Sequence, residues 1–213
     1  MDQRRLPTRG GLDNHLRAIR EGTTMPVIDI YRTLTDGEYT VTHSVVSDQN
    51  GPTAVRFELT RTVDGAVTET YANDEPWQAE TANGHTQIDG PTIIDATADI
   101  AATRQVVVST VEDILRDGKF ETLGDHLAGE DYIQHNPRFA DGISGLVAAV
   151  TALAEQGITM SYKGISQTVA EGDFGYTRSE GQFGGQPFIF HDLFRVIDGK
   201  CVEHWDVMVP ADA

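Results

Sequence analysis

The chain has 213 residues and a formal net charge of −17, from 33 acidic against 16 basic side chains. That length allows one large domain or two small ones. The negative field, with no basic stripe to offset it, excludes nucleic acid and anionic membranes as partners.

Cysteine usage and hydropathy exclude further classes. Cys201 is the single cysteine, which excludes an intrachain disulfide framework and a metal site of several cysteines. We expect it to be a small buried residue on the packing face of a strand. No apolar run is long enough to span a bilayer, and the first residues, MDQRRLPTRGG, lack the apolar segment of a secretory signal. We therefore expect a soluble, cytoplasmic protein.

The acidic composition also suggests an environment of high salt. Asp is abundant, and the lysines are only Lys119, Lys163 and Lys200. We predict that the melting temperature falls when salt is lowered from molar to millimolar, because unscreened acidic groups repel one another. Thermal unfolding at the two salt concentrations tests this. An unchanged melting temperature would contradict it.

The first half of the chain predicts one helix and four strands. Leu12, Leu16 and Ile19 recur at helical spacing before Gly22, which is placed to end a helix. Strands are expected over 27–34 and 39–46, separated by a turn, and a hairpin over 54–63 and 66–73. Residues 78–98 are mostly small and polar with Gly-Pro in the middle, so they predict a connection in which His85 is solvated.

From Asp99 the pattern becomes helical. A helix is expected up to 117, a short one over 120–127, and a third that Asp141 caps and Gly157 ends. Between the second and third lies a polar and aromatic loop, 131–137. Strands over 159–169 and 174–180 and a final hairpin, 188–209, complete the pattern.

An internal repeat relates the two halves. Residues 22–76 match residues 157–210 at an offset of 135 that falls to 134 within the hairpin. Leu59, Arg61, Asp64, Gly65 and Glu69, for example, recur as Leu193, Arg195, Asp198, Gly199 and Glu203. We interpret 1–77 as a partial, degenerate copy, 78–98 as a linker and 99–213 as the complete unit. The first copy lacks counterparts of the first two helices and of the loop 131–137. We therefore expect that the linker, the second unit or another chain covers its sheet, or that further sequence lies upstream.

The final hairpin contains the candidate site. Phe188, Phe190, Asp192 and Phe194 share one face of the first strand, and burial among aromatic rings disfavours the charged form of an acid. A two-residue turn would place Trp205 opposite Asp192, and a three-residue turn would place His204 there. The repeat favours the longer turn, because the residues lost from the first copy then all fall on one face. Asp192 and His204 are thus the predicted catalytic pair.

Two motifs resemble a known family. Asp192 to Asp206 read DLFRVIDGKCVEHWD, and Tyr132 to Pro137 read YIQHNP. Both are similar to motifs of the SnoaL-like polyketide cyclases, which belong to the nuclear-transport-factor-like superfamily. The resemblance implies an α+β fold in which a cone-shaped, curved antiparallel sheet wraps around helices, and an Asp acting as acid and base. The expected cavity lining is Tyr132, His135, Asn136, Phe188, Phe190, Phe194 and Asp206.

The predicted function is proton transfer on a small apolar carbonyl compound, such as aldol-type cyclisation or isomerisation. Asp192 would abstract the proton, and His204 would orient it or stabilise the enolate. No cofactor is expected. The alternative is a non-catalytic ligand-binding or assembly module of the same fold. The extra N-terminal copy favours an intrachain pseudo-dimer or a homo-oligomer through the sheet faces.

Each candidate residue also has a structural interpretation. Asp192 could be a hydrogen-bonded structural carboxylate, His204 and Asp206 a solvated strand end, and His135 with Asn136 part of a turn. A zinc or iron site of His135, His204 and Asp206 is a further alternative, although the expected metal content is none. Arg195 with Glu203, and Arg61 with Glu69, predict structural ion pairs.

Overall fold

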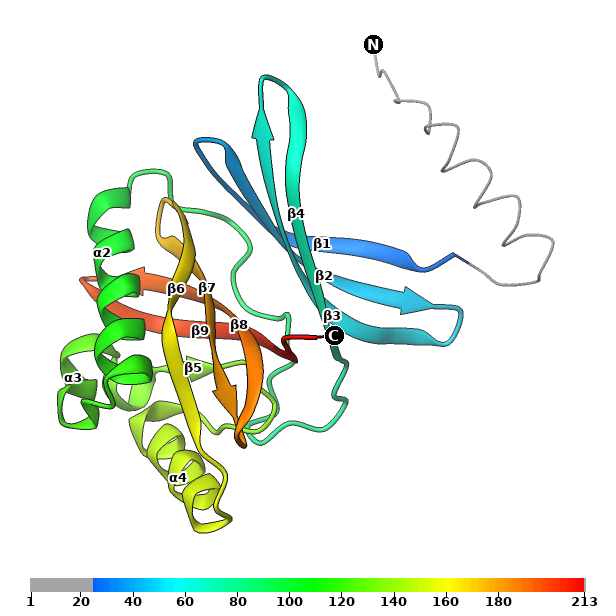
Figure 1. Cartoon of the computed structure of the whole chain (residues 1–213). Helices are drawn as coiled ribbons and strands as arrows, with labels where there is room; N and C mark the ends of the chain where they lie inside the picture. Colours follow the sequence, from blue (N-terminus) through cyan, green and yellow to red (C-terminus); the bar gives the residue numbers. More distant parts are fainter. Residues whose placement is uncertain (1–24, 213) are drawn as a thin grey trace.

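The computed structural model describes residues 25–212, and the predicted helix around Leu12, Leu16 and Ile19 lies outside them. The described chain forms three layers (Figure 1). Helices cover one face of a five-stranded sheet, and a four-stranded sheet packs on its other face. The fold is therefore α+β with antiparallel sheets, as predicted.

The N-terminal sheet is a meander of four antiparallel strands in sequence order. Its strands are β1 (Val27–Asp36), β2 (Tyr39–Asp48), β3 (Gly51–Val63) and β4 (Ala66–Pro76). Alternation decides which face is buried: Val55, Phe57 and Leu59 are almost fully buried, whereas the residues between them are half-buried. The sheet thus has one apolar face.

Residues 77–99, which contain no helix or strand, cross the molecule as an ordered strap. The buried Arg32 guanidinium donates hydrogen bonds to the backbone carbonyls of Ile88, Asp89 and Pro91, at 3.1, 2.6 and 2.8 Å. Gly90 has a φ of +86°, and a Cβ there would collide with Glu203 and Trp205. The predicted linker is therefore pressed against the C-terminal sheet, and its His85 is 35% exposed beside Asp89 and Asp141.

The helices precede and interrupt the second sheet. They are α2 (Ile100–Thr110), which continues as a π-helical turn η1 (Val111–Arg116), the 3₁₀ turns η2 (Phe120–Thr122) and η3 (Gly129–Asp131), α3 (Leu123–His126) and α4 (Gly142–Glu155). Asp99 caps α2, its carboxylate accepting from the amides of Ala101 and Ala102. Asp141 occupies the cap position of α4, but its carboxylate makes no capping bond and instead accepts from the Gln134 amide and from Asn83.

The C-terminal sheet has the order β5-β9-β8-β7-β6. Its strands are β5 (Ile133–Gln134), β6 (Met160–Glu171), β7 (Phe174–Phe183), β8 (Gln186–Ile197) and β9 (Lys200–Pro210). β5 lies within the predicted loop 131–137 and pairs in parallel with β9, Gln134 opposite His204. This short strand was not predicted, and it determines where the YIQHNP motif places its side chains.

Two apolar cores lie on either side of this sheet. One lies between the sheets and includes Phe57, Tyr176, Leu193 and Trp205, and the other lies under the helices and includes Val107, Ile114, Tyr162, Phe190 and Phe194. The C-terminal sheet and the strap therefore cover the apolar face of β1–β4. Trp205 is fully buried in the first core.

The turn of the final hairpin corrects the predicted register. Asp198 and Gly199, with φ of 50° and 76°, form a two-residue turn that pairs Ile197 with Lys200. The three-residue turn is therefore wrong, and so is the pairing of Asp192 with His204. A bulge then shifts the register between Val196 and Arg195, which places Asp206 opposite Asp192. His204 stays on the face of Asp192 because the extra residue restores the alternation.

The β3–β4 hairpin has the same turn and bulge. Asp64 and Gly65 have φ of 51° and 79°, and the register shifts after Arg61. Arg61 thus pairs with Glu69, as Arg195 does with Glu203, each through a 2.9 Å ion pair. The predicted ion pairs are confirmed. The bulge also turns the buried Cys201 toward the helices, away from the expected face, and burial raises its pKa to about 12.

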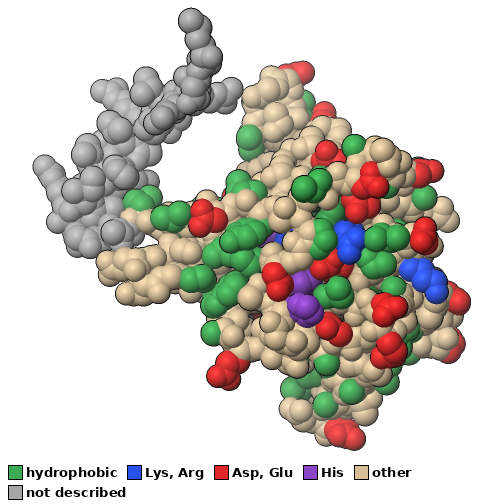
Figure 2. Space-filling model, turned by 180° about the vertical axis from the view of Figure 1, so that it is seen from behind, with side chains coloured by type: hydrophobic (Ala, Val, Ile, Leu, Met, Phe, Trp, Pro, Cys, Tyr) green, Lys and Arg blue, Asp and Glu red, His purple; other side chains and the backbone are tan. Residues whose placement is uncertain are grey.

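Acidic side chains are spread over the surface. Figure 2 shows this on one face of the molecule, where Asp and Glu side chains are scattered and Lys and Arg side chains are few. Among residues 25–212, no helix is both long and apolar enough to cross a membrane.

Candidate functional site

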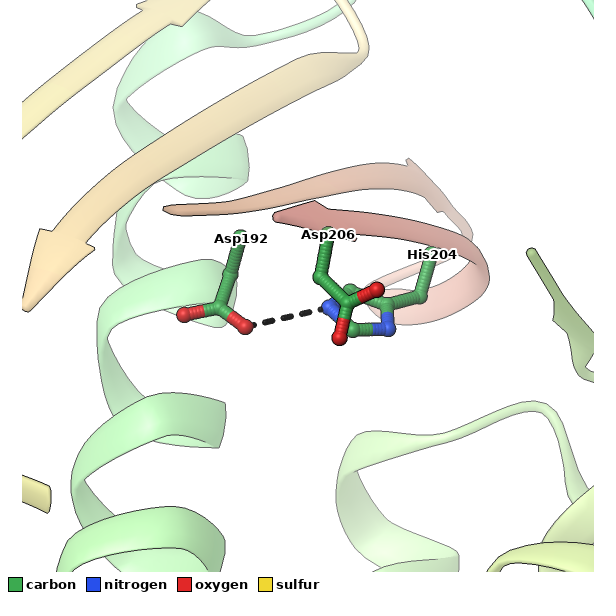
Figure 3. A group of neighbouring side chains, drawn as sticks. All are labelled: Asp192, His204 and Asp206. Atoms are coloured by element: carbon green, nitrogen blue, oxygen red, sulfur yellow. Dashed lines mark hydrogen bonds and ion pairs between the residues drawn. The ribbon is translucent and has the colours of Figure 1, made fainter. Parts of the chain in front are cut away.

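Three polar side chains project from one face of the β8–β9 hairpin into a buried cavity. They are Asp192, His204 and Asp206, which lie side by side in Figure 3. The cavity measures about 50 Å³. Most of its lining is apolar: Ile114, Leu115, Leu127, Tyr132, Phe139, Leu146, Met160, Tyr162, Phe194 and Met208. Two acids thus face each other across paired strands in an apolar setting, which is unfavourable for folding unless they share protons.

Among residues 25–212, Asp192 makes hydrogen bonds through only one of its carboxylate oxygens. Its Oδ1 accepts from the Tyr162 hydroxyl at 3.1 Å and lies 3.2 Å from His204 Nε2. Oδ2 is buried and makes no hydrogen bond to the described residues. Asp192 itself is 1% exposed, so the structure supplies an acid with one free oxygen at the cavity wall.

His204 is held in one tautomer by Gln134. The Gln134 Oε1 atom accepts from the Asn136 amide at 2.9 Å and lies 3.0 Å from His204 Nδ1. Because a backbone amide can only donate, this oxygen is an acceptor, and Nδ1 must therefore carry a proton. Nε2 and Asp192 Oδ1 then share one further proton. A carboxylate and an imidazole in this arrangement can hold a proton and transfer it to a third group.

Asp206 is the third member of the group. Its Oδ2 accepts from Asn136 Nδ2 at 2.7 Å, whereas its buried Oδ1 makes no hydrogen bond to the described residues. Burial raises the pKa of Asp206 to about 7; His204 opposes this shift, Glu75 adds to it, Asn136 opposes it and Asp192 adds to it. This acid therefore keeps its proton to a higher pH than an ordinary carboxyl group does.

We predict that Asp206 makes stability depend on pH. The unfolded chain releases this proton near pH 4, whereas the folded protein holds it up to about pH 7. Between these values the folded state binds more protons than the unfolded state. The contribution of Asp206 to the free energy of unfolding therefore falls as the pH rises. Urea unfolding of wild type and Asp206→Asn between pH 4 and 8 should show the variant gaining relative stability over this window. A pH-independent difference would contradict the prediction; other carboxylates cancel in the comparison.

The other predicted site residues are only partly brought together. Tyr132 and Phe194 line the cavity, and Asn136 reaches it through Asp206. Phe190 is buried behind the wall, stacked on Tyr162, and Phe188 lies beyond it, near Phe183.

His135 lies on the opposite side of β9, which corrects the expectation that it lines the cavity. It stacks on Trp205 with a 4.6 Å centroid separation, and its Nε2 lies 2.9 Å from Glu203 Oε1. The short strand β5 explains this placement, since side chains alternate and His135 follows the inward-facing Gln134. The alternative metal site of His135, His204 and Asp206 is therefore not assembled.

Tyr162 and Gln134 contact the site but were not predicted. The alternation of β6 places Met160 and Tyr162 at the cavity, and burial raises the pKa of the Tyr162 phenol well above its ordinary value. Tyr162 is thus a neutral hydrogen-bond donor to Asp192. A strand assignment for 133–134 would have found Gln134, because alternation then groups it with Asn136.

The group also has the spacing of a cation site. Donor atoms of Asp192, His204 and Asp206 all lie within 4.8 Å of one another. Two of these atoms, Asp192 Oδ1 and His204 Nε2, already face each other at 3.2 Å, within hydrogen-bond distance (Figure 3). We therefore interpret the three as a proton-sharing cluster and not as metal ligands.

Comparisons with known proteins give structural matches alone. No family model matches the chain, and no curated protein does. TsrD from Streptomyces laurentii is 25% identical, with a TM-score of 0.41, and the match covers 52% of this chain and 90% of that one. A putative ketosteroid isomerase from Kribbella flavida is 18% identical, with a TM-score of 0.44, covering 55% and 84%.

A SnoaL-like polyketide cyclase from Agrobacterium tumefaciens is also among the matches. It is 15% identical, with a TM-score of 0.40, and the match covers 50% of this chain and 91% of that chain. The matched structures thus include one that bears the name of the family that the two motifs resemble. The fold itself follows from the strand order and register described above.

Proposed function

We propose that the chain is an acid-base enzyme that moves a proton on a small, largely apolar carbonyl compound, in an isomerisation or an aldol-type cyclisation. The observation that carries this is the pair of buried carboxylates in an apolar cavity, each with one oxygen that bonds to nothing in the described protein. Proton-transfer chemistry is typical of clefts that hold a buried acid with a raised pKa, as Asp206 has.

The roles follow from the hydrogen bonds. Asp192 Oδ2 takes a proton from the carbon next to the carbonyl group, and the electron pair moves onto the carbonyl oxygen. His204 and Tyr162 hold Asp192 through its other oxygen. Asp206, in its protonated form, donates to the carbonyl oxygen and stabilises the enolate. In an isomerisation the proton on Asp192 returns to a different carbon as the carbonyl group re-forms. In an aldol-type cyclisation the enolate carbon adds to a second carbonyl group of the same compound, and the alkoxide oxygen formed there takes the proton.

The space around the cavity favours a ligand that extends beneath α4. Two further hollows of about 180 Å³ each lie beside this helix, and Met160 borders both of them as well as the cavity. Ligand sites usually measure about 300 to 1,000 Å³. Movement of the flexible Met160 side chain would join the three spaces into one of that size.

The proposal is tested by proton exchange. Short methyl ketones and cyclic enones are incubated with the protein in deuterated buffer, and loss of the signal from the protons next to the carbonyl is followed by NMR. Exchange above the buffer rate for at least one compound supports the proposal. A protein that binds members of the panel, measured by thermal shift, without accelerating exchange in any of them would contradict it.

The narrow cavity favours one alternative. At about 50 Å³ it holds few atoms as it stands, which fits a non-catalytic ligand-binding or assembly module. On this alternative no exchange would be seen with any compound: a ligand-binding module would still bind members of the panel, and an assembly module would bind none.

We propose that the N-terminal sheet is a degenerate second copy of the C-terminal one, ending near 77, and that the two copies form an intrachain pseudo-dimer. The shared turn and bulge of the β3–β4 and β8–β9 hairpins support this. The sheets also align, with β1 in contact with β6 and β4 with β9. In this proposal the N-terminal copy has lost the site and kept the packing face.

A further inference from the structure

The N-terminal sheet reaches the candidate site through one buried acid. Glu75, near the end of β4, is 3% exposed and points across the sheet interface toward β9. Its Oε2 accepts from the backbone amide of Met208 at 3.1 Å, and its Oε1 accepts from Arg138 Nη1 at 3.1 Å. Both partners belong to the C-terminal unit, and both lie close to the site.

A continuous set of hydrogen bonds leads from Glu75 to Asp206. The Arg138 amide donates to Asn136 Oδ1 at 2.9 Å, which leaves Asn136 Nδ2 free to donate to Asp206 Oδ2 at 2.7 Å. The amide of Met208, two residues after Asp206, fixes the strand on the other side. Glu75 therefore holds both the loop that presents Asn136 and the strand that presents Asp206.

We propose that Glu75 is a positioning residue of the site. The N-terminal sheet then helps to orient the site residues and does not serve as a scaffold alone. This inference rests on the proposed function in treating Asp206 as a site residue. It goes beyond it in assigning a role to a strand that contributes no side chain to the cavity.

The titration of Asp206 can report on the role of Glu75, because Glu75 is one of the groups that affect the pKa of Asp206. Asp192 and His204 face it from its own hairpin, Tyr132 and Tyr162 from the loop before β5 and from β6, and Glu75 from β4. The cavity residues contributed by α2, η1 and α4 are uncharged: Thr110, Ile114, Leu115 and Leu146. Glu75 is thus the one charge that the N-terminal sheet brings to Asp206 among the described residues.

The test compares Glu75→Gln with Asp74→Asn. Asp74 is the neighbouring acid on β4, but it is exposed and pairs with Arg56 on the outer face, so it is a matched control. In each protein the Asp206 carboxyl carbon is titrated by ¹³C NMR, and the side-chain amide of Asn136 is followed by ¹⁵N NMR. Neither readout needs turnover, so failure here and failure of the proposed reaction are distinguishable.

Glu75→Gln should lower the titration midpoint of Asp206 by roughly 0.5 to 1.5 pH units, because a nearby negative charge is removed. It should also shift the Asn136 amide signals, whereas Asp74→Asn should change neither. Glu75→Asp restores the charge on a shorter side chain. It should bring the Asp206 midpoint closer to its wild-type value than it brings the Asn136 amide signals to theirs.

Arg138→Gln is a second variant. We expect it to fold like the wild type, since the Arg138 side chain is 54% exposed. It should shift the Asn136 amide signals in the direction seen for Glu75→Gln. If the Asp206 midpoint and the Asn136 signals stay at their wild-type values in Glu75→Gln, or if neither responds in Arg138→Gln, the proposal is overturned and Glu75 serves packing only.

Discussion

Replacing Asp192 with Asn should abolish most of the proton exchange that the protein catalyses, with a loss of about 10²- to 10⁴-fold in rate. Asn keeps the shape of the side chain and can still accept from Tyr162, but it cannot take up a proton. The oxygen that faces both Tyr162 and His204 Nε2 is kept, but as an amide oxygen it can only accept a hydrogen bond from His204 and cannot hold a proton itself. The measurement is exchange of ketone protons in deuterated buffer, compared at equal concentrations of folded protein.

Two controls make the Asp192 result specific. Thr177, the cross-strand neighbour of Asp192 on β7, is fully buried yet does not border the cavity, so Thr177→Val tests whether disturbing this part of the sheet is enough to lose activity. Thermal unfolding should show that Asp192→Asn is still folded, because Asn fills the same volume, but less stable, because the buried pair with His204 is weakened. A variant that exchanges protons at the wild-type rate would refute the assignment of Asp192 as the base.

The inward position of the acid and imidazole could be predicted from the sequence because alternation in a strand is a strong constraint. One face of the hairpin does carry Asp192, His204 and Asp206. The predicted bounds of the hairpin, 188–209, are close to the observed bounds of β8 and β9. The register of the hairpin, in which Asp206 lies opposite Asp192, could not be predicted from the sequence. A two-residue turn followed by a bulge gives nearly the same alternation as a three-residue turn, and no residue type in the hairpin separates the two.

His135 shows a different limit. The sequence suggested that YIQHNP forms a loop at the cavity, because Asn-Pro is a turn signal and the motif is short. Two residues of it pair with β9, however, and this tertiary pairing decides that Gln134 and Asn136 face the site while His135 faces the other core. Strands as short as β5 have no periodicity to detect, so the role of Gln134 emerges only when β9 is in place.

The largest effect on stability is expected for Phe57→Ala, which should lower the free energy of unfolding by about 3–5 kcal/mol. The Phe57 ring is fully buried between the sheets. It stacks on His43 at a centroid distance of 4.4 Å and lies 5.6 Å from Tyr176 and 5.9 Å from His191, both in the other sheet. Truncation therefore removes contacts from both sheets at once. For a domain whose whole stability is about 5–15 kcal/mol, the loss is large.

The same variant decides whether the two sheets unfold together. Trp205 belongs to the C-terminal sheet and to the core that contains Phe57. In a Trp77→Phe background, which removes the other tryptophan, fluorescence reports on that sheet, while circular dichroism reports on all strands. Urea unfolding of Phe57→Ala should give one coincident transition by both probes, shifted to lower urea. Glu58→Ala, a change one residue away on the half-buried outer face, should shift it by no more than about 0.5 kcal/mol. If the fluorescence transition stayed at the wild-type midpoint while the dichroism transition moved, residues 27–76 would be an independent domain, and the dependence of the site on Glu75 would lose its physical basis.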